Sequence, residues 1–477
     1  MKLFLFFLYL INIIIKLINN KILKKLDESE DIKYLEYSFK RNLTLNKNIQ
    51  PEGFFTTYFY NQLYINLKVG SNKVEIPFYF YLQQYPFVLQ SSNVNESEVK
   101  GIYDELKSKT YEQINETTIN FNKGDLEEGI LSKDIFYLND NIKSFIKFYL
   151  SKKNFKNSHI TEGGKLGLKL YPDYEESKES CFIYNLKENN IISYNVFSFK
   201  YDSKNMNEDS GKLYIGAFPH LYNRFQFDEN NYIKNNIRKG RYELDWIYFF
   251  EEIKIGDNTF DFSKEAYFYT ELGFIIGSEN FFHYLDNSKI WFEYLNNIKK
   301  CHKQLFRIND FESNDFFFRF LYEFTGYYCD KDVDVEKLDL GEISFINKNI
   351  EYIFNLTMKD LWIEINGYKY FMIIKTLDLE NNWYFGKPFF KRYQLVFDYD
   401  NKIIGFYKYI NETGKENYED KKDRPILVYI LIIIGLVLII IGLVFLLIKC
   451  YFILPRKKRA NELSDDNYDY SDAGINS

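Results

Sequence analysis

Residues 383–393 read Trp-Tyr-Phe-Gly-Lys-Pro-Phe-Phe-Lys-Arg-Tyr, followed by Val-Phe-Asp at 396–398 and Ile-Ile-Gly-Phe at 403–406. Short aromatic and β-branched runs that end at Gly, Asn or Asp are typical of β-strands joined by turns. Similar runs lie at 78–80, 196–201, 213–215, 247–255 and 352–354. The sequence therefore predicts an all-β architecture between residues 54 and 409, with helices at 98–107 and 289–303 and a surface loop at 228–236.

Length and charge narrow the class of protein. The chain has 477 residues, which is more than one domain usually contains, so two lobes or two domains are expected. The formal net charge is -6, and the two signs alternate along the chain. No stripe of Lys and Arg lies ahead of the long apolar run 426–448, so nucleic acid is not predicted as a partner.

Two loop sequences follow strand-like runs at corresponding places. After the run 63–80 the chain reads Tyr-Leu-Gln-Gln at 81–84, and after 266–268 it reads Tyr-Thr-Glu-Leu at 269–272. The surroundings of both loops resemble the pepsin family of aspartic peptidases, whose loops there read hydrophobic-hydrophobic-Asp-Thr/Ser-Gly. In this register Tyr81 and Tyr269 stand at the two catalytic aspartate positions.

Further blocks resemble the same family in the family's order. Residues 63–70 are similar to its first strand, 119–134 to its flap hairpin and 164–168 to the segment behind the first catalytic loop. The run 185–216 is similar to the junction of its lobes, and 383–406 to its last strands. The resemblance implies a bilobal pepsin-like acid protease fold with a cleft between the lobes. Apart from the resemblance, the apolar run 426–448 predicts one carboxyl-terminal transmembrane helix outside this fold.

The resemblance also implies which residues line the cleft. The catalytic loops would form its floor and the flap its roof, with Phe121 in place of the flap tyrosine. The cleft-lining candidates are Tyr81, Gln83, Phe121, Gly124, Tyr269, Thr270 and Glu271. Either these large side chains fill the cleft as a second core, or the aromatic floor binds an extended polypeptide.

The family's chemistry needs one carboxylate from each lobe, because the two acids share a proton. Residues 76–90 contain neither Asp nor Glu, so the first acid is missing at any nearby register. Gln83 and Glu271 replace the loop glycines, which argues against the same tight turn. We predict no catalytic residue of this type.

Other chemistry is not indicated. The histidines, at positions 159, 220, 283 and 302, have no metal-ligand spacing, so neither a metal nor a cofactor is predicted. By the resemblance, Cys301 and Cys329 form the disulfide of the second lobe. Cys181 then lacks a luminal partner, and we expect a buried thiol.

The two ends of the chain indicate a membrane protein. The apolar run 3–15 suits a signal peptide, and 426–448 is long enough to span a bilayer, with Arg-Lys-Lys-Arg at 456–459 on its far side. This predicts a type I single-pass protein with a luminal or extracellular amino terminus. Glycosylation sequons on that side begin at Asn42, Asn95, Asn115, Asn355 and Asn411.

The predicted organisation divides the chain into seven parts. They are a signal peptide (1–20), a polar lead segment (21–52) read as mobile or as a pro-like remnant, a first lobe (53–219), a second lobe (220–412), a stalk (413–425), a transmembrane helix (426–448) and a cytosolic tail (449–477).

Three functions remain open. The first is a catalytically inactive membrane ectodomain of the secretory pathway or cell surface that binds a protein or peptide. The alternative is an active membrane-anchored aspartic endopeptidase, which would require a different register. A structural surface-coat protein is the third.

Overall fold

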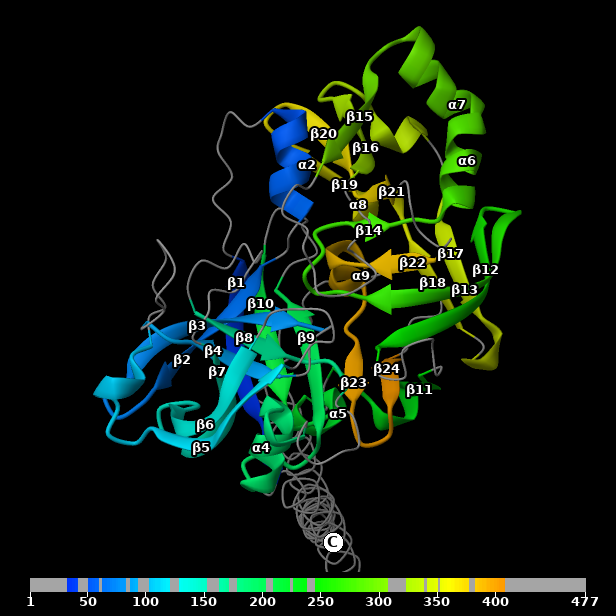
Figure 1. Ribbon diagram of the computed structural model, residues 1–477. Helices are drawn as coiled ribbons and strands as arrows, with labels where there is room; N and C mark the ends of the chain where they lie inside the picture. The colour runs from blue at the N-terminus through cyan, green and yellow to red at the C-terminus, as the bar shows by residue number, and fades with distance from the viewer. Residues whose placement is uncertain are drawn as a thin grey trace, which may run out of the picture. The chain divides into compact units, whose positions relative to one another are not determined.

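The computed structural model describes most of the predicted ectodomain. The described residues are 32–41, 50–59, 62–82, 86–92, 103–120, 128–151, 163–170, 178–202, 209–223, 226–237, 245–307, 323–338, 341–350, 352–376 and 382–407. Two large β-sheets carry about half of them (Figure 1), and a smaller share is helical, which confirms the prediction of an all-β architecture.

Within the described ranges, the larger sheet has thirteen strands. In spatial order they are β11 (Tyr232–Asn236), β24 (Ile403–Tyr407), β23 (Val396–Asp398), β9 (Val196–Tyr201), β10 (Ser210–Ile215), β1 (Leu35–Arg41), β2 (Leu63–Val69), β3 (Val74–Tyr81), β8 (Gly164–Gly167), β4 (Phe87–Gln90), β7 (Lys143–Ser151), β6 (Glu128–Tyr137) and β5 (Glu112–Asn120).

The smaller sheet has eleven strands in the part of the chain that the structure describes. They run in the order β18 (Tyr352–Leu356), β17 (Ile343–Asn347), β12 (Ile247–Ile255), β13 (Asn258–Phe268), β22 (Trp383–Phe385), β14 (Ile275–Ile276), β21 (Ile373–Thr376), β16 (Glu323–Asp330), β20 (Tyr368–Phe371) and β19 (Trp362–Ile365), with β15 (Cys301–Arg307) paired to β16.

Short helices complete the described part. The α-helices are α2 (Pro51–Phe59), α4 (Phe182–Glu188), α5 (Pro219–Tyr222), α6 (Glu279–Asn287), α7 (Lys289–Phe292), α8 (Met358–Leu361) and α9 (Lys387–Arg392). Single 3-10 turns lie at Glu105–Lys107, Glu229–Asn231, Val335–Leu338 and Lys348–Ile350, and a π-helical turn follows α7 at Glu293–Asn297.

Three sequence predictions need correction. The helix predicted at 289–303 ends at 297, because Cys301–Arg307 pairs along its whole length with β16. Within the described part of 98–107, only Glu105–Lys107 is helical. The loop predicted at 228–236 contains strand β11, whose backbone pairs with β24.

The predicted lead segment also contributes to the sheet. Leu35, Tyr37 and Phe39 are buried at alternate positions of β1, as in a strand with one face toward a core. Strand β1 pairs with β10 along its length and touches β2 at its end. The expectation of a mobile lead is therefore wrong for these residues.

Strands from both predicted lobes share the larger sheet. β23 pairs with β9, and β11 joins through β24, although β11, β23 and β24 belong to the predicted second lobe. Inside, one large cluster of buried aromatic and aliphatic side chains draws on both sheets. Phe397 of β23, for example, packs on Phe197 of β9 and near Phe268 of β13.

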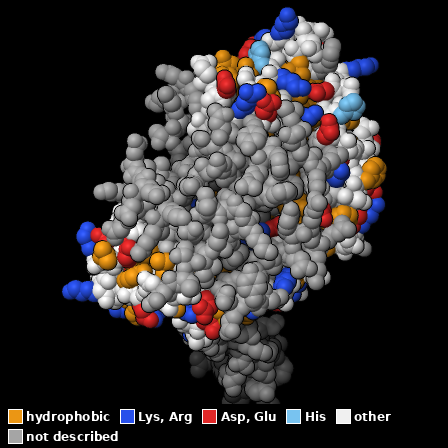
Figure 2. Space-filling model, viewed as in Figure 1, with side chains coloured by type: hydrophobic (Ala, Val, Ile, Leu, Met, Phe, Trp, Pro, Cys, Tyr) orange, Lys and Arg blue, Asp and Glu red, His pale blue; other side chains and the backbone are white. Residues whose placement is uncertain are grey.

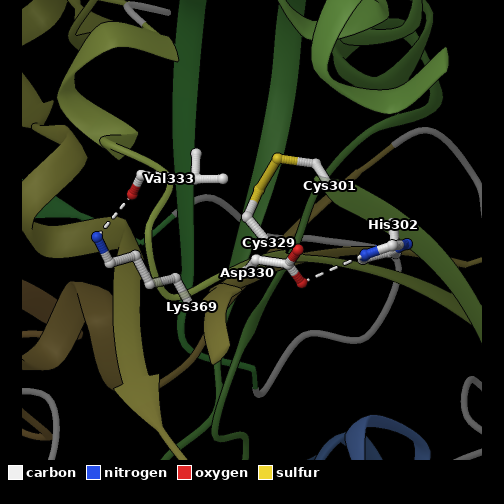
Figure 3. The surroundings of a disulfide bond; sticks show 6 residues. All are labelled: Cys301, His302, Cys329, Asp330, Val333 and Lys369. Carbon is white, nitrogen blue, oxygen red and sulfur yellow. Dashed lines mark hydrogen bonds and ion pairs between the residues drawn. A yellow bond between two sulfur atoms is a disulfide. The ribbon is translucent and has the colours of Figure 1, made fainter. Parts of the chain in front are cut away.

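The predicted disulfide is confirmed. Cys301 and Cys329 occupy paired positions on β15 and β16, with Cα atoms 3.9 Å apart (Figure 3). Next to them the His302 ring lies 3.5 Å from a carboxylate oxygen of Asp330. Cys181 is free and buried, as predicted, and burial raises the pKa of its thiol to about 12.

Removing the disulfide should lower the free energy of unfolding by about 3 kcal/mol, because the cross-link closes a loop of 28 residues in the unfolded chain. The variant Cys301→Ser/Cys329→Ser and the wild type should be compared by denaturant unfolding. Cys181→Ala is the control for loss of a buried thiol that forms no cross-link. Unfolding midpoints that do not respond to reductant in the wild type would contradict the prediction.

Candidate functional site

The same strand crossover occurs twice in the described chain. In the larger sheet, β8 lies between β3 and β4, parallel to the first and antiparallel to the second. In the smaller sheet, β22 lies between β13 and β14 with the same directions. In each case the two flanking strands follow one another in the chain, and the middle strand comes from a later segment.

The first crossover places Tyr81 at the end of β3. Phe80 pairs with Leu166 of β8, and Tyr81 pairs with Gly167. The carbonyl of Tyr81 accepts a hydrogen bond from the N–H of Leu168 at 2.7 Å. Seven positions separate Phe80 from the start of β4 at Phe87.

The second crossover repeats this register. Phe268 pairs with Phe385 of β22, the residue before Gly386, and the N–H of Tyr269 donates to the carbonyl of Phe385 at 2.9 Å. Seven positions again separate Phe268 from Ile275, where β14 begins. Tyr81 and Tyr269 therefore hold equivalent positions in the two halves, in loops of equal length.

The two tyrosines lie in different surroundings. Tyr81 is half-buried at the edge of a small cluster with Tyr79 and Tyr149, and the Lys165 ammonium lies 5.5 Å from the centre of its ring. Tyr269 is only 4 % exposed and belongs to a separate aromatic cluster.

The other cleft candidates divide into described and undescribed residues. Thr270 is buried, and its hydroxyl donates to a carboxylate oxygen of half-buried Glu271 at 3.3 Å. Gln83, Phe121 and Gly124 lie outside the described residues. Neither equivalent loop position carries a carboxylate.

Sequence reasoning missed a main component of this site, the helix α2. It buries Phe54, Phe55, Tyr58 and Phe59 in the same aromatic cluster as Tyr269. The N–H of Gly273 in the second loop donates to the carbonyl of Phe59 at 2.7 Å. The spacing of the buried aromatics is a helical signal, but it does not reveal what the helix packs on.

Two glycines allow α2 to approach closely. A Cβ added to Gly273 would lie 1.9 Å from the carbonyl oxygen of Tyr58, and one added to Gly326 of β16 would lie 2.3 Å from the Phe55 ring. Backbone and ring therefore occupy the space that any larger residue would need. The helix covers the second loop in direct contact.

A buried group of charges surrounds the end of α2. The Lys387 ammonium is fully buried and contacts a carboxylate oxygen of Asp209 and the hydroxyl of Tyr58. The Arg41 guanidinium lies 3.2 Å from Asp209, and it also donates to the carbonyl of Tyr58. Asp209 thus sits between two cations that come from β1 and α9.

The pKa values reflect this arrangement. Burial raises the pKa of Asp209, but the charges of Lys387 and Arg41 outweigh it and hold that pKa below 3.8. Burial lowers the pKa of Lys387 well below 10.5, against the opposing charge of Asp209. Burial also raises the pKa of the Tyr58 hydroxyl, which stays protonated.

Other potential sites are limited within the described residues. No group of three or more His, Cys, Asp or Glu side chains there could hold a metal ion. A pocket of about 600 Å³ is lined by Phe260, Asn280, His283, Tyr284, Asn287 and Ser288, none of which is a predicted cleft residue. On the face shown in Figure 2, Lys and Arg side chains lie among Asp and Glu.

Two of the five sequons fall on described strands. Asn115 lies in β5 and Asn355 in β18, both half-buried, and the Asn355 amide oxygen accepts a hydrogen bond from Ser344 at 2.9 Å. Asn42, Asn95 and Asn411 lie outside the described part of the chain. Glycosylation stays a prediction at all five.

The comparison with known families matches this geometry. A sequence model of the eukaryotic aspartyl protease family matches residues 66–409, which is most of the chain. The chain belongs to the eukaryotic aspartyl protease family. Its two sheets and repeated crossover have the pepsin-like fold of that family. No curated protein matches the chain significantly.

The membrane prediction falls outside the described structure. Among the described residues, no helix is both long and apolar enough to cross a bilayer. The predicted transmembrane residues 426–448 are not among them.

The two partners of the buried ion pair should differ in their mutational cost. Asp209→Asn leaves Lys387 and Arg41 buried without this carboxylate, and should cost about 3–5 kcal/mol. Lys387→Met leaves Asp209 paired with Arg41, and should cost only about 1–2 kcal/mol. Denaturant unfolding near neutral pH measures both.

The same experiment has a pH dependence with a defined sign. Because the folded-state pKa of Asp209 lies below 3.8, its contribution is present above that pH and lost as the pH falls below it. The stability of the wild type should therefore fall more steeply below pH 3.8 than that of Asp209→Asn. Equal pH profiles of stability would show that Lys387 and Arg41 do not stabilise the ionised carboxylate of Asp209.

Proposed function

We propose that this aspartyl protease family member is catalytically inactive and serves as a protein-binding ectodomain held at a membrane. The main support is the equivalence of Tyr81 and Tyr269. Both follow the same strand crossover, at the same distance from the next strand. A shared-proton pair of acids requires a carboxylate at each of these places.

A different register does not rescue catalysis. Residues 76–90 contain no acid, so the first loop has no carboxylate to offer at any position. In the second loop Glu271 stands two positions beyond Tyr269, and a single acid does not form the pair. These observations favour the inactive chain over an active endopeptidase.

The packing of the second loop favours a filled cleft over an open aromatic floor on that side. Tyr269 and Thr270 are 4 % and 2 % exposed, so neither is available to an outside ligand while α2 is in place. The first loop differs, because Tyr81 is only half-buried. A partner would therefore meet the first loop and the outer surfaces before it met the second loop.

The purified ectodomain should not cleave denatured protein at acid pH, because it lacks the acid pair. An active pepsin-family enzyme in the same assay is the control. Pepstatin-sensitive cleavage by the unmodified chain would overturn the proposal. Tyr81→Asp/Tyr269→Asp should also stay inactive, because Gln83 and Glu271 still replace the loop glycines and small displacements of catalytic groups cost large factors in rate.

Membrane topology is tested separately. Protease added to sealed vesicles that carry the full chain, with its amino-terminal part inside, should leave that part intact and remove only the segment beyond residue 449, because Arg and Lys at 456–459 favour the cytosolic side. Detergent-permeabilised vesicles are the control, in which everything is digested. Digestion of the large domain in sealed vesicles would contradict the type I orientation.

A further inference from the structure

Helix α2 leaves the sheet to which the strands on either side of it belong. β1 and β2 are neighbours in the larger sheet, where Lys40 pairs with Tyr64 and Arg41 with Leu63. The helix between them packs instead on the smaller sheet. Figure 1 shows it beside β15 and β20, and Arg41 at the end of β1 still reaches the Tyr58 carbonyl near its end. Residues 51–59 thus leave the larger sheet between β1 and β2 and pack on the smaller sheet.

The surface that receives α2 is aromatic, and its parts come from four separate elements. We call it the α2 seat: the loop 269–274, β15, β16 and Tyr370 of β20. Phe54 stacks on Tyr370 with ring centres 3.7 Å apart, and Phe55 stacks on Phe306 at 5.1 Å. Phe59 lies 4.7 Å from Phe324 of β16.

The seat also recognises the backbone and the polar tip of the segment. The N–H of Gly273 donates to the Phe59 carbonyl. Beside the seat, the Lys387 ammonium of α9 contacts the Tyr58 hydroxyl. The glycines at 273 and 326 remove the Cβ atoms that would block the helix. Ring pockets, a backbone donor and a cation for a tyrosine hydroxyl are together the features of a polypeptide-binding site.

We propose that the α2 seat is a binding site for an aromatic polypeptide segment, that α2 is its resident ligand, and that an outside segment of the same chemistry binds only when α2 leaves. The inference rests on the proposed binding function. Strands of one sheet hold α2 on both sides, so a single cut in either connection would leave it tethered. In this proposal the seat is closed while α2 occupies it, and it opens when a competing segment displaces α2.

A labelled synthetic peptide with the sequence of residues 50–61 tests this in trans. Fluorescence anisotropy should detect no binding to the wild-type full chain in detergent, because its own α2 fills the seat. The variant Phe54→Asp/Phe55→Asp disables the resident helix and should bind the peptide at least about 100-fold more tightly. The same peptide carrying both Asp substitutions should bind neither protein.

The matched control is Phe262→Asp, which makes the same substitution at a phenylalanine of β13 that is 64 % exposed and outside the seat. This variant should behave as the wild type. Equal peptide binding by the wild type and the Phe54→Asp/Phe55→Asp variant would overturn the proposal. Absence of peptide binding by that double variant would also overturn it, provided that the variant keeps its Cys301–Cys329 disulfide and its near-UV spectrum.

If that variant does not fold, hydrogen exchange on the unmodified chain decides. The amides of α2 and of Gly273 should then be protected together and exchange in one cooperative opening. Exchange of the α2 amides at the rate of an unstructured peptide would overturn the proposal.

The outcomes also separate this inference from the proposed function. If the Phe54→Asp/Phe55→Asp variant binds the peptide and also cleaves protein at acid pH, the proposed binding site is supported and the proposed catalytic inactivity is wrong. If the variant neither binds the peptide nor cleaves protein, the proposed binding site is wrong and the proposed catalytic inactivity is supported.

Discussion

The pairing of β22 between β13 and β14 is the interaction on which the site depends. Trp383, Tyr384 and Phe385 are fully buried and pair in parallel with 266–268, so they fix where β13 ends and the loop begins. The loop 269–274 then lies over the end of β22, and its Gly273 receives α2. Lys387, in the first turn of α9 directly after Gly386, reaches Tyr58 and Asp209 from the same anchor. One buried strand therefore positions the loop, the seat and the charge group together.

A scaffold of this kind does not need its acids to fold. Two carboxylates close together oppose folding in their charged form, because like charges repel in a poorly solvated place. In the inactive chain that we propose, Tyr269 stands at the second of these positions, and its ring adds to an aromatic cluster instead. Lys387 lies directly after Gly386, in the last block that resembles the family. That place holds a buried cation paired with Asp209.

The sequence predicts the parts of this structure that rest on local pattern and on order along the chain. The strands follow from local pattern, whereas the two loops and the Cys301–Cys329 pair follow from the resemblance to the pepsin family. The structure bears out the fold and the disulfide. Strand β1 was missed although its alternation is visible, because Glu36, Ser38 and Lys40 alternate with its apolar residues and made the segment look like a polar lead. Its partner β10 is far away in the sequence, and no local signal identifies such a pairing.

Helix α2 was missed for a different reason, and that reason bears on how the seat works. A helix of nine residues with a glycine inside is marginal by itself, so its order comes from tertiary contacts that local pattern does not contain. The same dependence makes it displaceable, since little intrinsic helical preference holds it in shape once the contacts are lost. Its tethers oppose displacement, because a linked segment competes at an effective concentration on the order of millimolar. An outside partner present at micromolar concentration must therefore bind the seat about a thousand times more tightly than α2 does. Only a segment with more contacts than the resident helix meets that condition.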